Sequence, residues 1–246
     1  MKIDIRGIRL NLNIFKNILS LLYFALTKKI YFGPFSALEN FEINNYKVNL
    51  RPNEVLIKTL YGGYCGSDKK IITYDYSFLS SAFLTNKKIN DQYLYMGHEV
   101  IGELIKVGEK VKNFKAGDKI TIDSMNRDYE IKNNKFGGWT NFMIRNEKQI
   151  LRVNPKKLDK SIFLEPLACA LQPVKSTDHK NKKVLIIGLG TMGMCLASII
   201  RYFYNKKVKI YGISNNYNDK KKIKKNIFNK FVISNDLLQG SSKLIN

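Results

Sequence analysis

Met96-Gly97-His98-Glu99-Val100-Ile101-Gly102 is the most informative motif of this chain, and its pattern continues to Gly108 and Val111. It places an imidazole beside a carboxylate, just ahead of a run at 103–107 that is typical of a strand entering a turn. Two further stretches carry metal-binding side chains: Cys65-Gly66-Ser67-Asp68 upstream and Glu165-Pro166-Leu167 downstream. Because Zn²⁺ accepts thiolate, imidazole and carboxylate ligands at a tetrahedral site, we predict a mononuclear catalytic zinc.

A glycine-rich motif follows the apolar run at 184–187, and residues 194–204 after it are apolar at helical spacing. Strand, glycines and helix in this order indicate a dinucleotide site, because the backbone N–H groups at the helix start hold a pyrophosphate. A second strand is expected at 208–213. The residues expected to contact the cofactor are Gly188, Gly190, Thr191, Met192, Gly193, Ser214 and Asn215.

Together these motifs resemble the zinc-dependent medium-chain dehydrogenase/reductase family, which includes alcohol, polyol and threonine dehydrogenases. The family's zinc signature stands complete here as Gly97-His98-Glu99, Gly102, Gly108 and Val111, and the resemblance runs from about Lys29 to the last residue. It implies an α/β fold, in which an N-terminal β-rich GroES-like catalytic domain is followed by a Rossmann domain with a doubly wound parallel sheet.

The resemblance also implies a domain plan. We expect an N-terminal extension at 1–28, the GroES-like zinc domain at 29–175 and a partial Rossmann domain at 176–246. Strands are expected at 184–187, 208–213 and 231–233, whereas a complete dinucleotide fold has six. The half that cradles the nicotinamide is missing, so we expect a truncated gene or a fragment.

Local patterns predict the remaining elements. The apolar run at 14–26 is shorter than the about 20 residues that span a bilayer, and we expect a helix that packs on the body or lies on a membrane surface. Residues 161–175 are expected to be helical, and 74–93 read as an insertion beside the substrate cleft. Short strands, making a mostly antiparallel β domain, are expected at 30–32, 41–43, 54–59, 120–122 and 139–144.

The family resemblance assigns roles to the metal-site residues. It implies Cys65, His98 and Glu99 as zinc ligands. Glu165 would lie near the catalytic water, close enough to the ion to exchange with one of these ligands. Asp68 would orient His98 through the second ring nitrogen. The alternatives are a structural cysteine at position 65 and a solvated turn aspartate at position 68. No structural zinc is expected, because residues 123–136 contain no cysteine.

The implied chemistry is hydride transfer between a secondary alcohol and NADP or NAD, with zinc as Lewis acid. Ser67 would accept the hydroxyl proton. Relatives often carry a histidine relay at the position of Lys70, which leaves the proton exit open. An acid after the second strand would bind the ribose 2′-OH of NAD, but Ser214-Asn215-Asn216 holds none, and lysines 220–222 follow. Uncharged and basic groups tolerate the 2′-phosphate, so NADP is favoured. The alternative is that these lysines are only a solvated helix face.

Composition limits the other functions. The net charge of +22 comes from 35 lysines and 7 arginines spread along 246 residues. Many asparagines and isoleucines accompany them, as A/T-rich codons would give, and there is no Arg-rich helix or zinc-finger spacing. We therefore expect no nucleic-acid partner. Three cysteines, an odd number, indicate a reducing, cytoplasmic location.

We interpret the chain as a dehydrogenase of a polyol, sugar alcohol or amino-alcohol. We expect no transmembrane segment, and a homo-oligomer is one option for a full-length chain. The main alternative is an inactive remnant of the family that retains zinc binding, nucleotide binding or both. A zinc-free reductase and a peripheral membrane module at 14–26 are further alternatives.

Overall fold

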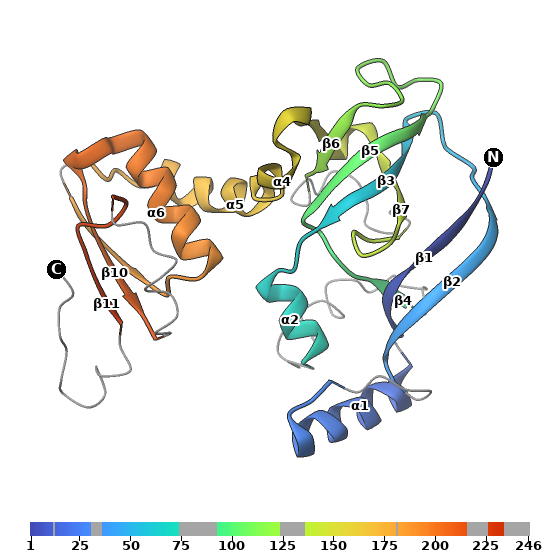
Figure 1. Ribbon diagram of the computed structural model, residues 1–246, viewed down its shortest axis with the longest axis horizontal. Coiled ribbons are helices and arrows are strands. Elements are labelled where there is room, and N and C mark those ends of the chain that lie inside the picture. Colours follow the sequence, from blue (N-terminus) through green and yellow to red (C-terminus); the bar gives the residue numbers. More distant parts are fainter. Residues whose placement is uncertain are drawn as a thin grey trace. The chain divides into compact units, whose positions relative to one another are not determined.

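The computed structural model describes residues 1–11, 13–30, 36–73, 93–123, 136–180, 182–215 and 226–233. They form two compact units, Met1–Ile162 and Phe163–Asn246 (Figure 1). Most of the insertion expected at 74–93 and the lysines at 220–222 lie outside the described residues. The predicted domain limits at 28/29 and 175/176 stay predictions.

A five-stranded antiparallel sheet forms the centre of the first unit, in the order β7-β3-β5-β6-β8. Its strands bury apolar side chains on both faces. One buried cluster contains Val55, Ile57, Leu104 and Ile120, and a second contains Leu56 and Ile144. The expected antiparallel character is confirmed. The strands are β3 (Glu54–Gly62), β5 (Val100–Val107), β6 (Lys119–Ile122), β7 (Phe142–Asn146) and β8 (Ile150–Arg152).

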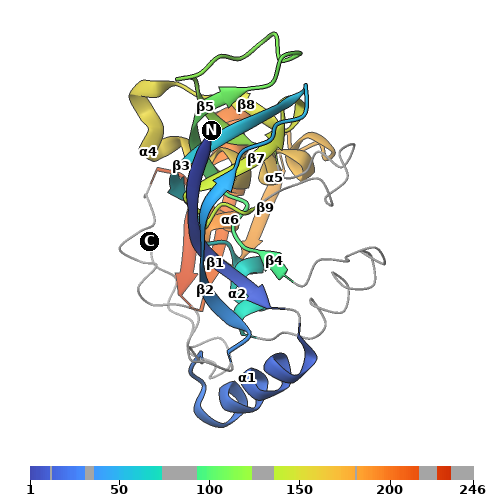
Figure 2. The ribbon, with the colours of Figure 1, turned by 90° about the vertical axis from the view of Figure 1, so that its right-hand side faces the viewer.

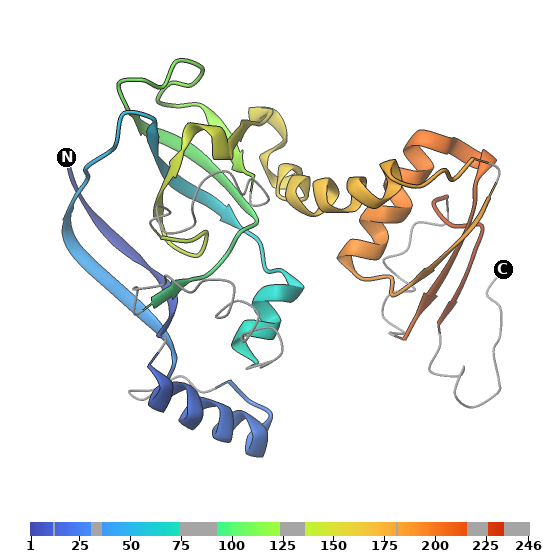
Figure 3. The ribbon, with the colours of Figure 1, turned by 180° about the vertical axis from the view of Figure 1, so that it is seen from behind.

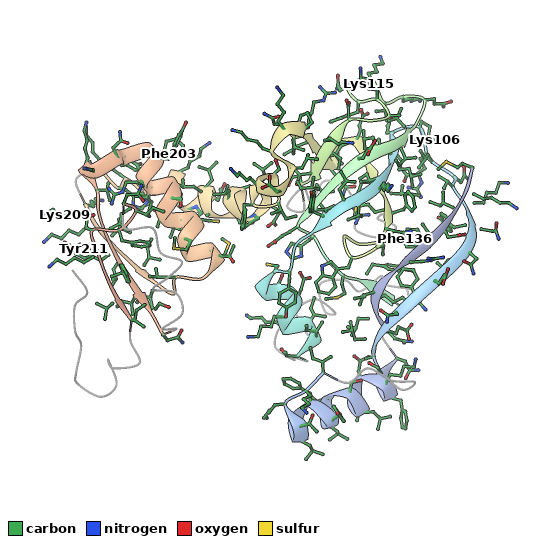
Figure 4. All side chains as sticks on the ribbon, viewed as in Figure 1. Lys106, Lys115, Phe136, Phe203, Lys209 and Tyr211 are labelled. Carbon is green, nitrogen blue, oxygen red and sulfur yellow. The ribbon has the colours of Figure 1, made fainter. Side chains whose placement is uncertain are left out.

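A second antiparallel sheet, β2-β1-β4, consists of β1 (Lys2–Asn11), β2 (Leu38–Lys47) and β4 (Tyr93–Tyr95). β1 is not among the strands expected from the sequence, yet its Ile5 and Leu10 are fully buried. Phe136 belongs to the same buried cluster as Ile5 (Figure 4) and packs edge-on against Tyr46 and Tyr95 at ring separations of 5.3 Å. The first residues are therefore part of the core of this unit.

The helix expected at 14–26 is present as α1 (Ile14–Thr27), near the ends of β1 and β2 (Figure 2). Asn13 caps it, since its Oδ1 accepts from the backbone N–H groups of Phe15 and Lys16. Leu21 and Phe24 pack against the buried cluster that contains Leu10, Leu38 and Met96. No described helix has the length and apolar character needed to cross a membrane.

The remaining short elements of the first unit connect its sheets and lead to the second unit. They are the helices α2 (Gly66–Ile72) and α4 (Leu158–Ser161) and the 3₁₀ turns η2 (Glu147–Gln149) and η3 (Pro155–Lys157).

The second unit contains a three-stranded parallel sheet in the order β11-β10-β9, with α6 packed against it (Figure 3). The three expected strands are confirmed as β9 (Lys183–Ile187), β10 (Lys209–Ser214) and β11 (Lys230–Ile233). The helices are α5 (Leu164–Lys175), α6 (Thr191–Tyr204) and the short η4 (Asn205–Lys207). An antiparallel unit followed by a parallel βαβ unit confirms the α/β class.

Candidate metal centre

Pairing between β3 and β5 brings the candidate ligands together. Cys65 and His98 are 33 positions apart in the sequence, but β3 ends and β5 begins at paired residues, Gly62 and Val100. Just past this pair, the Gly63 N–H donates to the Glu99 carbonyl at 2.7 Å. The turn after β3 therefore lies directly against the turn before β5.

Three potential ligands converge at this point. One ligand atom from each of Cys65, His98 and Glu99 lies within 4.8 Å of the other two; Cys65 and His98 are half-buried, and Glu99 is 9% exposed. Bonds of about 2.0–2.3 Å to a tetrahedral ion place its ligand atoms about 3.5 Å apart. One sulfur, one nitrogen and one oxygen at this spacing fit Zn²⁺ after small side-chain rotations.

Asp68 connects two of these residues. It is 2% exposed; its Oδ2 accepts from the Cys65 backbone N–H at 3.0 Å, and its Oδ1 lies 3.7 Å from His98 Nδ1. The carboxylate raises the pKa of His98 to about 9, while burial of the ring acts in the opposite direction and Cys65 adds to the rise. Because Nδ1 faces Asp68, Nε2 is the nitrogen that can bind a cation.

The other candidate residues of the site differ in position. Ser67 is half-buried in the first turn of α2, two residues after Cys65, and Lys70 is exposed on the same helix. Glu165 lies in the first turn of α5, in the second unit, where its Oε1 is 3.5 Å from Cys169 Sγ. The role expected for Glu165 at the metal therefore stays a prediction.

The glycine turn of the second unit has the geometry of an anion site. Gly188 has a φ of +92°, and its N–H donates to the Ile213 carbonyl at 2.8 Å. A Cβ on Gly193 would lie 2.0 Å from the Gly188 carbonyl oxygen, whereas one on Gly190 would meet no atom within 4 Å. The space at the start of α6 thus fits a pyrophosphate, which its N–H groups and dipole would bind.

The remaining cofactor candidates lie at two strand and helix ends. Met192 is 46% exposed in the first turn of α6, next to Thr191. Ser214 ends β10 and is 2% exposed, and Asn215 follows it on the surface. The preference for NADP over NAD stays a prediction.

Trp139 contacts both metal-site turns, although the sequence pattern indicates it only as part of a strand. Its indole N–H donates to the Gly63 carbonyl at 2.8 Å, and its backbone N–H donates to the Met96 carbonyl at 3.1 Å. The pair Gly137-Gly138 before it was a signal that the backbone approaches another segment closely at this point.

Comparison with known proteins agrees with this geometry. Residues 51–155 match the family model of the alcohol dehydrogenase GroES-like domain. Geissoschizine synthase of Alstonia scholaris is 27% identical over 219 residues, covering 76% of this chain and 56% of that protein. Sorbitol dehydrogenase of Halalkalibacterium halodurans is 28% identical over 192 residues, covering 70% and 52%. The chain thus spans about half the length of the curated relatives it matches.

Solved structures share the fold. Galactitol-1-phosphate dehydrogenase from Escherichia coli superposes with a TM-score of 0.57 at 20% identity, covering 74% of this chain and 54% of that one. TarJ from S. aureus, in complex with NADPH, has a TM-score of 0.62 at 18% identity, covering 97% and 62%. Residues 51–155 therefore carry the alcohol dehydrogenase GroES-like domain, and the chain resembles dehydrogenases of this kind in sequence and in fold.

Proposed function

We propose that this chain belongs to an oxidoreductase that transfers hydride between the secondary alcohol of a polyol, sugar alcohol or amino-alcohol and NADP or NAD. The observation that carries the proposal is the convergence of one ligand atom each from Cys65, His98 and Glu99 within 4.8 Å. Relatives named sorbitol dehydrogenase and L-threonine 3-dehydrogenase support this substrate class.

In this proposal Cys65, His98 and Glu99 hold one catalytic zinc. A bound Zn²⁺ supplies the Lewis acidity that lowers the pKa of a substrate hydroxyl. Asp68 keeps His98 in the orientation that presents Nε2 to the ion. Ser67, two residues beyond Cys65 at the start of α2, would accept the substrate's hydroxyl proton and pass its own proton outward to solvent.

The glycine turn has a separate task. We propose that the backbone N–H groups at Gly190, Thr191 and Met192 bind the cofactor's pyrophosphate, with Gly188 and Gly193 shaping the turn. NADP or NAD supplies the hydride acceptor. Ser214 and Asn215 carry no acid that would repel a 2′-phosphate, which supports NADP. A cytoplasmic location is part of the same proposal, and so is a homo-oligomer in the full-length protein.

The test combines metal analysis with a dehydrogenase assay. The purified wild-type chain is expected to contain about one zinc, the Cys65→Ser and His98→Gln variants far less, and the matched controls Cys169→Ser and His179→Gln as much as wild type. Each protein is then assayed with NADP and NAD against a panel of polyols. Far below one zinc in the wild type would refute the proposal, and zinc binding without turnover would favour the inactive remnant.

Gly190→Ala tests the nucleotide site independently. Because a Cβ there meets no protein atom within 4 Å, the fold should be unaffected. The methyl group would instead occupy space that the pyrophosphate needs. We expect unchanged thermal unfolding and weaker NADP binding by calorimetry. Wild-type binding in this variant would contradict the proposed role of the turn.

A further inference from the structure

We propose that Trp139 is a positioning residue for the metal centre: its indole holds the turn that carries Cys65 against the turn that carries His98. The inference rests on the proposed metal function. It assigns to Trp139 no contact with substrate, cofactor or ion, so its effect on the site would pass through the two turns.

The first contact is with the turn before Cys65. The Trp139 Nε1–H donates to the Gly63 carbonyl at 2.8 Å across 76 positions of sequence. The ring also stacks on Tyr64, with centroids 5.9 Å apart and planes inclined by 22°. Gly63 and Tyr64 are the two residues immediately before Cys65. The indole therefore fixes the position and the orientation of the backbone that carries the thiol.

The second contact is with the turn before His98. The Trp139 backbone N–H donates to the Met96 carbonyl at 3.1 Å, and the Gly138 N–H donates to the Gly97 carbonyl at 2.9 Å. Gly97 has a φ of +85°, and a Cβ added there would lie 2.5 Å from Trp139 Cδ1. The ring edge therefore fills the space left by the absent side chain, against the backbone that leads to the imidazole.

Both turns are thus fixed by one side chain and the backbone around it. The direct link between the turns is the hydrogen bond from the Gly63 N–H to the Glu99 carbonyl, 2.7 Å long. The indole bond to the Gly63 carbonyl uses the other polar group of the same residue. Ligands held in place before the ion arrives bind it more tightly, because less freedom is lost on binding.

Co²⁺ titration of the metal-free chain of 246 residues tests this inference, because the ion's visible absorption reports ligand geometry. Trp139→Phe keeps a ring but deletes the N–H donor. We expect about tenfold weaker Co²⁺ binding and an altered visible spectrum, the size typical of losing an outer partner of a metal site. The matched control is Tyr202→Phe, which changes an aromatic side chain that is 80% exposed on α6. It should bind Co²⁺ like wild type.

The outcomes separate cleanly. A folded Trp139→Phe variant with wild-type Co²⁺ affinity and spectrum overturns this inference and leaves the proposed function intact. A wild-type chain that takes up neither Co²⁺ nor Zn²⁺ overturns both. A merely structural role would lower the unfolding temperature of the variant without changing the spectrum of its folded, cobalt-bound form, and that result also counts against the inference.

A second measurement uses the wild type and does not depend on whether the variant folds. Trp139 is the single tryptophan of the chain, so its fluorescence reports on this position alone. Zn²⁺ added to the metal-free wild type should change the emission, whereas the same addition to Cys65→Ser should not. Emission that stays constant while the wild type takes up zinc would overturn the inference.

Discussion

Replacing Asp68 by Asn should move the titration of His98 in the metal-free chain from about 9 down toward the ordinary pKa of 6.5. Asp68 Oδ1 lies 3.7 Å from His98 Nδ1, and the carboxylate is the largest cause of the raised pKa. Asparagine keeps an oxygen that can accept from the Cys65 N–H but removes the charge. Without the negative charge at position 68, burial of the ring lowers the His98 pKa with less compensation from its neighbours.

The size of the effect follows from the pKa. At ~1.4 kcal/mol per pKa unit, a rise from 6.5 to about 9 corresponds to ~3.5 kcal/mol in favour of the imidazolium. The His98 side chain is 32% exposed, so solvent screening leaves ~1–2 kcal/mol of this as stability. Because the folded pKa lies above the unfolded one, the contribution is complete below pH 6.5 and is lost as the pH rises through about 9.

The assay is NMR of the metal-free chain with labelled histidine. His98 and His179 are the two histidines of the sequence, so a His179→Gln variant assigns the remaining resonance and serves as the control. We expect the His98 resonance to titrate near 9 in wild type and well below that in Asp68→Asn. Equal titration curves in the two proteins would refute the assigned coupling.

Three further predictions concern the same sites. Apparent zinc affinity should rise tenfold or more per pH unit between 7 and 9, because the His98 imidazolium and the Cys65 thiol must both release a proton to bind the ion. Chelator competition measures this, and a flat profile would contradict it. Gly63→Ala should weaken zinc binding in the same assay, since its Cβ would lie 2.3 Å from Glu99 Oε2, whereas the control Gly66→Ala meets no atom within 4 Å. Gly193→Ala should lose ~1–3 kcal/mol in urea unfolding, because its Cβ would lie 2.0 Å from the Gly188 carbonyl oxygen; unchanged stability would argue against this packing.

Many of the strands and helices could be predicted from the sequence, because the patterns that indicate them are local. A short apolar strand, three glycines and an amphipathic helix predict one βα unit, and the structure has it as β9 and α6. The alternation of Val55, Ile57 and Thr59 likewise predicted β3. Each pattern reports how one segment faces its own core, so neighbours distant in the sequence are not needed to recognise it.

The elements that were missed depend on distant partners. β1 alternates Ile3 and Ile5 with charged residues, but Gly7 interrupts the pattern, and a Cβ there would lie 2.5 Å from the Trp139 carbonyl oxygen. The interruption makes sense only once the two segments are seen side by side. The contact of Trp139 with the metal-site turn could not be predicted for the same reason. Its indole N–H donates to the backbone carbonyl of Gly63, and every residue type offers such a carbonyl.

The site and the fold of the first unit depend on one another. The strands that pair at Gly62 and Val100 carry ligands from two separate segments, so the unfolded chain has no preformed set of donors. A slip of one residue in the pairing of β3 with β5 would turn every side chain to the other face of the sheet. The register also shifts between Thr59 and Tyr61, just before the turn toward Cys65. A bulge of this kind re-aims the end of a strand, and here it directs the chain into the turn where the thiol meets the imidazole.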